Sequence, residues 1–312
     1  MAVLEDVTSP PATGLRPRGA GRRERWSRRL PLLPALIYTI IVTQVPFLVT
    51  LWYSFQSYFW NEPGGAHWTG VSNYKEVFTD PNFRSALWRS VTMTAIAVIV
   101  AMLLGIALAV LLDKKFFGRG VVRTLIITPF LVMPAAAALV WAGPMLDPSF
   151  GLLNWLLEPF GVNHVAWLTT HAYGSVIVVM IWQWTPFMTL IVLAGLQGQA
   201  QDTLEAAKVD GANAWATFRE LTLPHLRPYI ELGVLLGSIY LVTAFDQVRL
   251  MTNGGPGTTT TTLPFYLYQK VNYAFDIGGA AAAGVVTVVL TIIVASFALR
   301  LFASVFQFEE AK

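Results

Sequence analysis

Residues 205–228, EAAKVDGANAWATFRELTLPHLRP, lie between two strongly apolar segments of a 312-residue chain. Asp202, with Glu205 three residues later, predicts a capping box that starts a short helix. Gly211 then allows a turn, since glycine adopts positive φ without a Cβ clash. Asn213 predicts the cap of a second helix, which the Leu-Pro pair at 223–224 ends. The stretch predicts a rigid two-helix loop, although an ordinary amphipathic loop fits the capping and periodicity equally well.

The composition is that of a membrane protein. Hydrophobic residues make up 55% and charged residues 12% of the chain, against about 25% charged residues in soluble domains. Without cysteine, disulfide and thiolate chemistry are excluded. Six segments reach the length of about 20 residues that a spanning helix needs: 30–54, 89–112, 122–142, 173–196, 229–250 and 278–305. The first is predicted to be retained, because its apolar run exceeds that of a signal peptide and no small-x-small site ends it.

Basic residues set the expected orientation, since Lys and Arg gather on the cytoplasmic side. With the N-terminus inside, that side holds sixteen of the 21 Lys and Arg. Seven of them lie in a basic tail, residues 1–29, which this topology explains better than nucleic-acid binding does. The loop 197–228 and the tail 306–312 are then cytoplasmic as well.

Two outer loops carry recognisable local structure. Residues 143–172 are punctuated by Pro and Gly and predict a short surface helix near 151–158. After the fifth span, Asn253, Gly254, Gly255 and Pro256 predict a rigid turn. That turn is a candidate contact for a soluble partner, and a plain connector is an equally open interpretation.

Several motifs are missing from the sequence. No Gly-x-x-x-x-Gly-Lys-Ser/Thr loop is present, so phosphates are not bound by that route. No catalytic triad or metal-ligating cluster is recognisable, and the four histidines are scattered. We therefore expect no catalytic residue, no metal site and no cofactor in this chain.

A series of motifs resembles the permease subunits of carbohydrate ABC importers, such as those for maltose, glycerol phosphate and polyols. In chain order they are PFLVMPAAAALVW, SFGLLN, GVNHVAWL, IWQWTPFMTLIVLAGL, EAAKVDGA, LTLPHLRP and LMTNGGPG. The family's cytoplasmic EAA loop matches residues 205–224, with Leu221 where the family usually has Ile. The resemblance covers about 30–305. It implies an all-α, MetI-like permease domain with six transmembrane helices, as in type I ABC importers.

The resemblance also implies partners and site residues. A second homologous permease, two ATPase subunits that hold ATP and Mg²⁺, and an extracytoplasmic solute-binding protein would assemble with this chain in a bacterial plasma membrane. A sugar, disaccharide or polyol would cross by alternating access. The implied ATPase-coupling residues are Glu205, Ala206, Ala207, Gly211, Trp215, Phe218, Leu223 and Pro224. The implied solute contacts are Phe130, Gln183, Trp184, Tyr240, Ala244 and Asp246, and the binding-protein contacts are residues 253–256.

Alternatives remain open from the residues themselves. The aromatic side chains of the spans also fit core or lipid-facing positions. Asp246 fits an ion pair with Arg249 three residues on as well as solute binding. A self-contained secondary transporter would show inverted repeats, broken helices and acids near the midplane. A membrane enzyme would need a cluster of catalytic groups, which is not apparent.

Overall fold

The computed structural model describes residues 33–162 and 164–310, and it is almost entirely helical. The predicted tail 1–29, the start of the first span and residues 311–312 lie outside the described residues. The chain divides into two compact units, residues 1–49 and 50–312. Helix α2 (Leu33–Ser54) accounts for the described part of the first unit and extends into the second.

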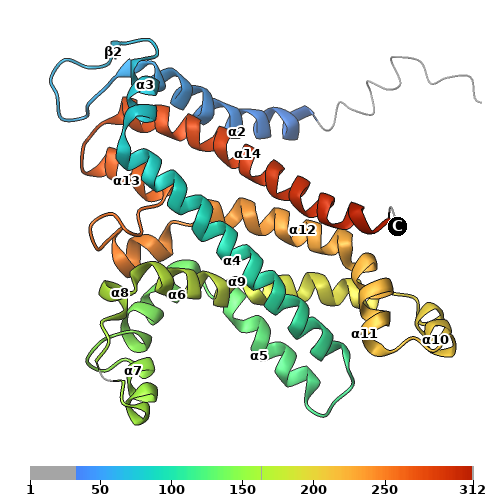
Figure 1. Cartoon of the computed structure of the whole chain (residues 1–312). Helices are drawn as coiled ribbons and strands as arrows, with labels where there is room; N and C mark the ends of the chain where they lie inside the picture. The colour runs from blue at the N-terminus through green and yellow to red at the C-terminus, as the bar shows by residue number, and fades with distance from the viewer. Residues whose placement is uncertain (1–32, 163, 311–312) are drawn as a thin grey trace, which may run out of the picture. The chain divides into compact units, whose positions relative to one another are not determined.

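The second unit consists of helices joined by short connections (Figure 1). A two-strand pair, β1 (Gln56–Ser57) and β2 (His67–Trp68), is antiparallel. The α-helices are α3 (Ser72–Thr79), α4 (Pro81–Asp113), α5 (Arg119–Leu131), α6 (Pro134–Val140), α7 (Leu152–Leu157), α8 (Trp167–Thr170), α9 (Ala172–Gln197), α10 (Gln201–Val209), α11 (Ala214–Thr217), α12 (Leu223–Val242), α13 (Leu263–Asn272) and α14 (Ile277–Glu310). Short π or 3₁₀ segments are η2 (Trp141–Met145), η3 (Glu158–Phe160), η4 (Phe218–Thr222) and η5 (Val248–Thr252). The surface helix predicted near 151–158 is thus present as α7.

Length and composition support up to five of the six predicted spans. Helices α2, α4 and α9, and α14 as far as Phe297, are each long and apolar enough to cross a membrane. The bent pair formed by α5 with residues 134–145 would be a fifth span. The fifth predicted span, 229–250, stays a prediction, because α12 is not among the described helices that meet these criteria.

The third predicted span, 122–142, is broken rather than continuous. Residues 119–131 and 134–145 form two helices that meet at an angle of 99°. Pro134 has no N–H to give to the preceding helix, and it forces Met133 into an extended conformation with ψ of 135°. The proline therefore ends one helix and begins the next.

The fifth predicted span also differs from expectation. Helix α12 starts six residues before 229, and it ends at Val242 with a short irregular segment before η5. Its first turns carry Arg227 and Glu231, whose Nε and Oε1 atoms form an ion pair at 2.9 Å. The helix thus begins in a polar environment and becomes apolar only after Glu231.

Helix α12 packs against α4, α9 and α14, and α4 packs against α9 (Figure 1). These four helices contain most of the buried hydrophobic residues. Helices α4 and α9 approach closely because Gly105 faces Met188. A Cβ on Gly105 would lie 2.6 Å from the Met188 Cβ. The Sδ atom of the same methionine packs against Gly233 of α12, and its Cε atom packs against Gly237. Met188 therefore fills a socket made by glycines of two other helices, an arrangement typical of membrane helix packing.

A polar network joins α3, α13 and the start of α14. Lys270 Nζ lies 3.0 Å from Glu76 Oε1 and 3.1 Å from Asp276 Oδ2, and Asp276 is buried. Burial lowers the pKa of Lys270, but its hydrogen bonds to Glu76 and Asp276 outweigh this, so the pKa is raised overall. Burial also raises the pKa of Tyr266, and its 2.6 Å hydrogen bond to Asp80 raises it further. Both side chains are therefore protonated at neutral pH, and each donates hydrogen bonds to carboxylates.

The Met188 socket makes a prediction about stability. Gly105→Ala should destabilise the protein by about 1–3 kcal/mol, because the added methyl overpacks the contact with Met188. Gly174→Ala, in α9 where no neighbouring atom lies within 4 Å of the position that the new methyl takes, should be neutral or stabilising. Thermal unfolding of both variants in detergent measures the difference. A Gly105→Ala protein as stable as Gly174→Ala would contradict the packing argument.

Candidate functional site

The loop between α9 and α12 forms two short helices, as the sequence predicts. Gly211 has φ of +85° and makes the turn between them. Asn213 Oδ1 accepts a hydrogen bond from the Ala216 N–H at 2.8 Å, which confirms the predicted cap. The predicted capping box at Asp202 is wrong: α10 begins at Gln201 after Ala200, with no side-chain cap. Asp202 lies instead in the first turn, where its charge suits the helix dipole.

The predicted end of the second helix at the Leu-Pro pair is also wrong. Helix α11 continues through η4 directly into α12. Pro224 lies in the first turn of α12, where a missing N–H is tolerated, and the preceding N–H of Leu223 bonds to the Phe218 carbonyl across the π turn. The loop is therefore joined to the core by continuous helix rather than by a flexible link.

The side chains of this loop divide between two faces. Glu205, Ala206 and Val209 are exposed, Val209 at 87%, whereas Ala207 is half-buried. Trp215 is 69% exposed and stacks on half-buried Phe218 with ring centroids 6.1 Å apart. Of the predicted coupling residues, Glu205, Ala206, Gly211, Trp215 and Pro224 are exposed, and Ala207, Phe218 and Leu223 are half-buried. An exposed, partly apolar surface is thus held on a rigid pair of helices.

At the break between α5 and α6, a buried amide replaces the lost helical partner. Gln183 Nε2 donates to the Val132 carbonyl at 2.9 Å, and Gln247 Nε2 donates to Gln183 Oε1 at 2.8 Å. Gln183 is only 3% exposed. Its amide is therefore occupied by structural hydrogen bonds in this conformation, and it does not present a free group to a solute.

The other predicted solute residues gather beside this break. Trp184 has ring centroids 5.8 Å from Phe130, 5.4 Å from Phe187 and 5.5 Å from Tyr240. Tyr240 is 59% exposed, so one side of the cluster is open. Trp182 points elsewhere on α9 and packs against Trp141, with ring centroids 5.5 Å apart. Three predicted residues from three helices, Phe130, Trp184 and Tyr240, thus form one aromatic surface.

The predicted pairing of Asp246 with Arg249 is not found among the ion pairs of the described residues. Arg249 Nη1 donates instead to Asn253 Oδ1 at 2.8 Å, and its guanidinium lies 5.2 Å from the centroid of the Tyr268 ring. Ala244, in the irregular segment that follows α12, and Asp246, at the start of the helical turn that leads into η5, are half-buried. The arginine therefore anchors the turn at residues 253–256.

The outer turn at residues 253–256 is held by threonines. Thr252 and Thr260 hydroxyls lie 2.6 Å apart, and the Thr260 hydroxyl donates to the Gly255 carbonyl at 3.0 Å. Asn253 and Gly254 have positive φ, and Gly254 is buried against Phe265. Asn253 and Pro256 are exposed, so these two residues present the turn to solvent.

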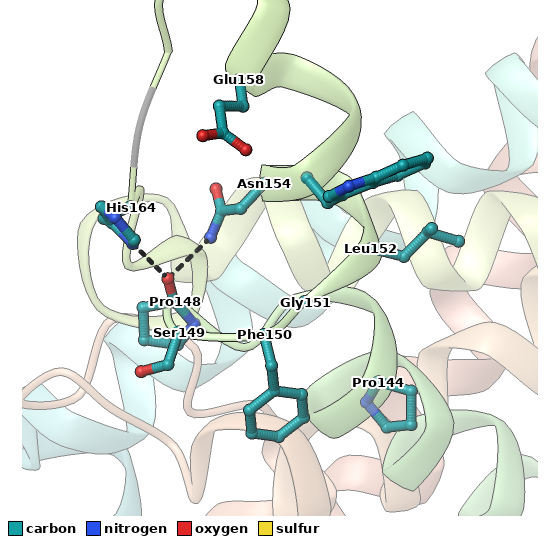
Figure 2. Close-up of a pocket in the computed structure, with 10 residues that line it drawn as sticks. Pro144, Pro148, Ser149, Phe150, Gly151, Leu152, Asn154, Glu158 and His164 are labelled. Atoms are coloured by element: carbon teal, nitrogen blue, oxygen red, sulfur yellow. Dashed lines mark hydrogen bonds between the residues drawn. The ribbon is translucent and has the colours of Figure 1, made fainter.

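A second outer feature is a cavity of about 280 Å³ beside α7 (Figure 2). His164 Nδ1 lies 3.1 Å from the Pro148 carbonyl, which also accepts a hydrogen bond from Asn154 Nδ2 at 3.4 Å (Figure 2). Asn154 Oδ1 accepts from the Val165 N–H and from Trp167 Nε1. The side chains of Asn154 and His164 thus organise the loop between α6 and α9.

Sequence reasoning missed three contributors to these sites. Gln247 gave no local signal because its partner Gln183 is distant in the chain, and Phe187 gave none because it lies inside an apolar segment. Asn154 does lie in the SFGLLN motif, which could have identified it. Among the described residues, no group of three or more His, Asp or Glu is placed to hold a metal ion.

Comparison with known proteins establishes the family. Residues 101–306 match the family of inner membrane components of binding-protein-dependent transport systems. The chain belongs to this family, and it is a multi-pass membrane permease subunit. The function predicted from the motif order is thereby confirmed over that of a self-contained secondary transporter, even though a broken helix is present.

Individual relatives agree with this assignment. The chain is 39% identical to the "Probable ABC transporter permease protein y4oQ" of Sinorhizobium fredii, over 85% of this chain and 86% of that protein. It is 32% identical to the trehalose/maltose transport system permease protein MalF of Thermococcus litoralis, over 84% and 89% of the two chains. A chain of a bacterial alginate ABC transporter, crystallised with an alginate pentasaccharide-bound periplasmic protein, has the same fold. That chain gives a TM-score of 0.75 at 22% identity, over 88% of this chain and 93% of its own length.

The two glutamines should act as one unit. Gln183→Leu and Gln247→Leu should each destabilise the protein by about 1–3 kcal/mol, because each leaves a buried polar partner unpaired. The double variant should cost clearly less than the sum of the two single variants. Thermal unfolding of all four proteins in one detergent gives the cycle. Additive effects would show that the amides are not coupled.

Proposed function

We propose that this chain is one half of the translocation pathway of an ATP-driven carbohydrate importer. Separate ATPase subunits act on the loop 197–228, and no nucleotide is bound by this chain. The observation that carries the proposal is the continuous helix from α11 through η4 into α12. A push on an isolated flexible loop would be absorbed, whereas a push on this loop moves α12 as a rigid body.

The exposed face of the loop suits an ATPase partner. The side chains of Glu205, Ala206 and Val209 in α10 and that of Trp215 in α11 are exposed. Small and apolar side chains allow close approach, and buried aromatic residues commonly dominate binding energy at interfaces. The partner docks on this face, with Trp215 as the anchor and Glu205 as a charged contact.

The proposed orientation places this loop in the cytoplasm with both termini. It follows from the distribution of Lys and Arg along the chain. The turn at 253–256 then faces outward, where the exposed Asn253 and Pro256 contact an extracytoplasmic binding protein. A second, similar permease completes the pathway in the bacterial inner membrane.

A carbohydrate is the solute class that the structure and a relative support together. The relative from Thermococcus litoralis is named for trehalose and maltose transport. In this chain, the rings of Phe130, Trp184 and Tyr240 form an aromatic surface at which one side is open. Aromatic faces pack on the C–H-rich faces of sugars. Because the Gln183 amide is occupied, the partner permease supplies most of the polar contacts, with Asp246 as the polar candidate in this chain.

The coupling role predicts a specific loss of function. Glu205→Lys and Gly211→Pro should abolish ATP-driven uptake in proteoliposomes, because one reverses the charge of the docking face and the other forbids the positive φ of the turn. Solute binding to the purified receptor should be unchanged. Glu62→Lys, an equal charge reversal in an exposed outer loop, serves as the control.

Co-purification gives the same test in a binding assay. Tagged wild-type protein and Glu62→Lys should retain ATPase subunits in mild detergent, and Glu205→Lys should lose them. Wild-type protein that never retains an ATPase, or a Glu205→Lys variant with normal uptake, would refute the proposed coupling.

The proposed solute contact at the aromatic surface predicts that removing one of its rings lowers the uptake rate. Trp184→Ala should lower the maximal uptake rate at saturating receptor by about 2- to 10-fold, because one stacking face is removed. Trp182→Ala, which disrupts only the pair with Trp141, should change it less. The solute is first identified by titrating the purified receptor with disaccharides, polyols and glycerol phosphates. Equal effects of the two substitutions would place the solute elsewhere.

A further inference from the structure

A cavity of about 400 Å³ lies beside the proposed coupling loop and is lined in part by Leu204 and Lys208 of α10. It is formed where the ends of α4 and α9 meet α10, α11 and η4. Its apolar wall comes from Val110, Leu196, Leu204 and Phe218. Val110 and Leu196 are in the last turns of two helices that are long and apolar enough to span a membrane. The cavity is therefore at the boundary between the membrane interior and water.

The same cavity carries an excess of positive charge. Lys114 and Lys208 line it, together with the carboxylate of Asp113. Among the described residues, neither lysine forms an ion pair, and both are exposed. Two lysines and one aspartate give the lining a net charge of +1. An apolar wall with one excess positive charge matches a ligand that has both an acyl chain and a singly charged anionic group.

The orientation of the chain in the membrane indicates whether a lipid headgroup or a free phosphate is the better anionic ligand for this cavity. With this loop in the cytoplasm, the cavity opens at the level of inner-leaflet headgroups, where basic pockets between helices bind anionic lipids. Lys115, Arg119 and Arg123 follow in the same inner turn and add to the positive potential. A free phosphate would use only the lysines and leave the apolar wall uncovered.

We propose that this cavity binds the phosphate group and upper acyl chain of an inner-leaflet anionic phospholipid of the phosphatidylglycerol class. The phosphate lies between Lys114 and Lys208, and the chain lies against Leu204 and Phe218. The inference rests on the proposed function, because that proposal places the cavity on the cytoplasmic side of the membrane. A lipid held there contacts both the coupling loop and the ends of α4 and α9, so its presence stabilises their contact.

The two lysines lie on different elements, Lys208 in α10 and Lys114 directly after α4. Leu204 and Lys208 are four residues apart in α10 and share one helix face. Lys208 is exposed, as Glu205, Ala206 and Val209 are, and it is only three residues from Glu205. Lys114 is outside the loop, so its substitution alone tests lipid binding without changing the proposed docking face.

The test uses native mass spectrometry of the full-length chain, purified with whatever subunits accompany it. Dioleoyl phosphatidylglycerol and dioleoyl phosphatidylcholine are titrated separately, and inorganic phosphate and glycerol phosphate are added as soluble competitors. Lys114→Gln/Lys208→Gln should weaken phosphatidylglycerol binding about 10- to 30-fold in total, since each lysine near the membrane surface contributes about three- to fivefold. Lys115→Gln/Arg119→Gln removes the same charge from nearby residues that do not line the cavity, and it should weaken binding clearly less.

A second variant tests the apolar wall without changing the charge of the cavity. Ala212→Phe should reduce phosphatidylglycerol binding by filling the cavity that Ala212 lines. Equal loss in both double variants, equal binding of the two lipids, or no loss in Lys114→Gln/Lys208→Gln would overturn the proposal. Displacement of lipid by millimolar phosphate would assign the site to a soluble anion instead and also overturn it.

These outcomes are independent of the coupling proposal. Lipid binding is measured on the permease itself and needs no ATPase. If ATPase subunits co-purify and the lysine variant still binds lipid, the lipid site alone is wrong. If lipid binding follows the prediction and no ATPase is retained, the coupling role alone is wrong.

Discussion

Inside a membrane, no water is available to donate a hydrogen bond to a backbone carbonyl that lacks its helical partner. Another group of the protein must therefore donate that hydrogen bond. Helix α5 ends at Leu131, which leaves the Val132 carbonyl without a helical donor, and Gln183 Nε2 donates to it instead. Gln247 then holds the other end of the Gln183 amide. Through this pair, the break in the third span is tied to α9 and to the segment that follows α12. The aromatic surface of Phe130, Trp184 and Tyr240 is assembled beside that tie, which gives the proposed solute contacts a fixed framework.

The coupling loop depends on a different kind of continuity. Proline in helical sequence usually indicates an end, and Pro224 on its own predicts one. In the structure, the proline occupies the first turn of α12, and the π turn before it carries the chain on without a gap. A π turn is held less regularly than an α-helix and frequently occurs at functional positions. Here it lies between the proposed docking surface and α12, the helix that carries Tyr240, so the proposed coupling would pass along a single helix.

The sequence was sufficient for features with a local cause. Apolar length predicted α2, α4, α9 and α14, and a short polar side chain predicted the Asn213 cap. It was insufficient where the cause was distant: Gln183 and Gln247 are 64 residues apart, and nothing near either indicates the other. The predicted cap at Asp202 was wrong because α10 begins at Gln201, so that Asp202 lies two residues after the N-cap position, Ala200. The break had a local signal in Pro134, but the long apolar segment around it still predicted one continuous span. Hydropathy measures how apolar a residue is and does not register that a proline ends a helix.

The Met188 socket has a consequence for how this chain can change over time. The Met188 Sδ and Cε atoms lie where side chains on Gly233 and Gly237 would be, so the size of the residue in α9 is matched to the absence of side chains in α12. A larger residue at 233 or 237 has to be compensated by a smaller one at 188, whereas the Cβ and backbone of residue 188 exclude a side chain at 105 whatever its size. Positions 188, 233 and 237 should therefore vary as a correlated set across related sequences, even though they lie on two separate helices and none of them touches a proposed partner or solute.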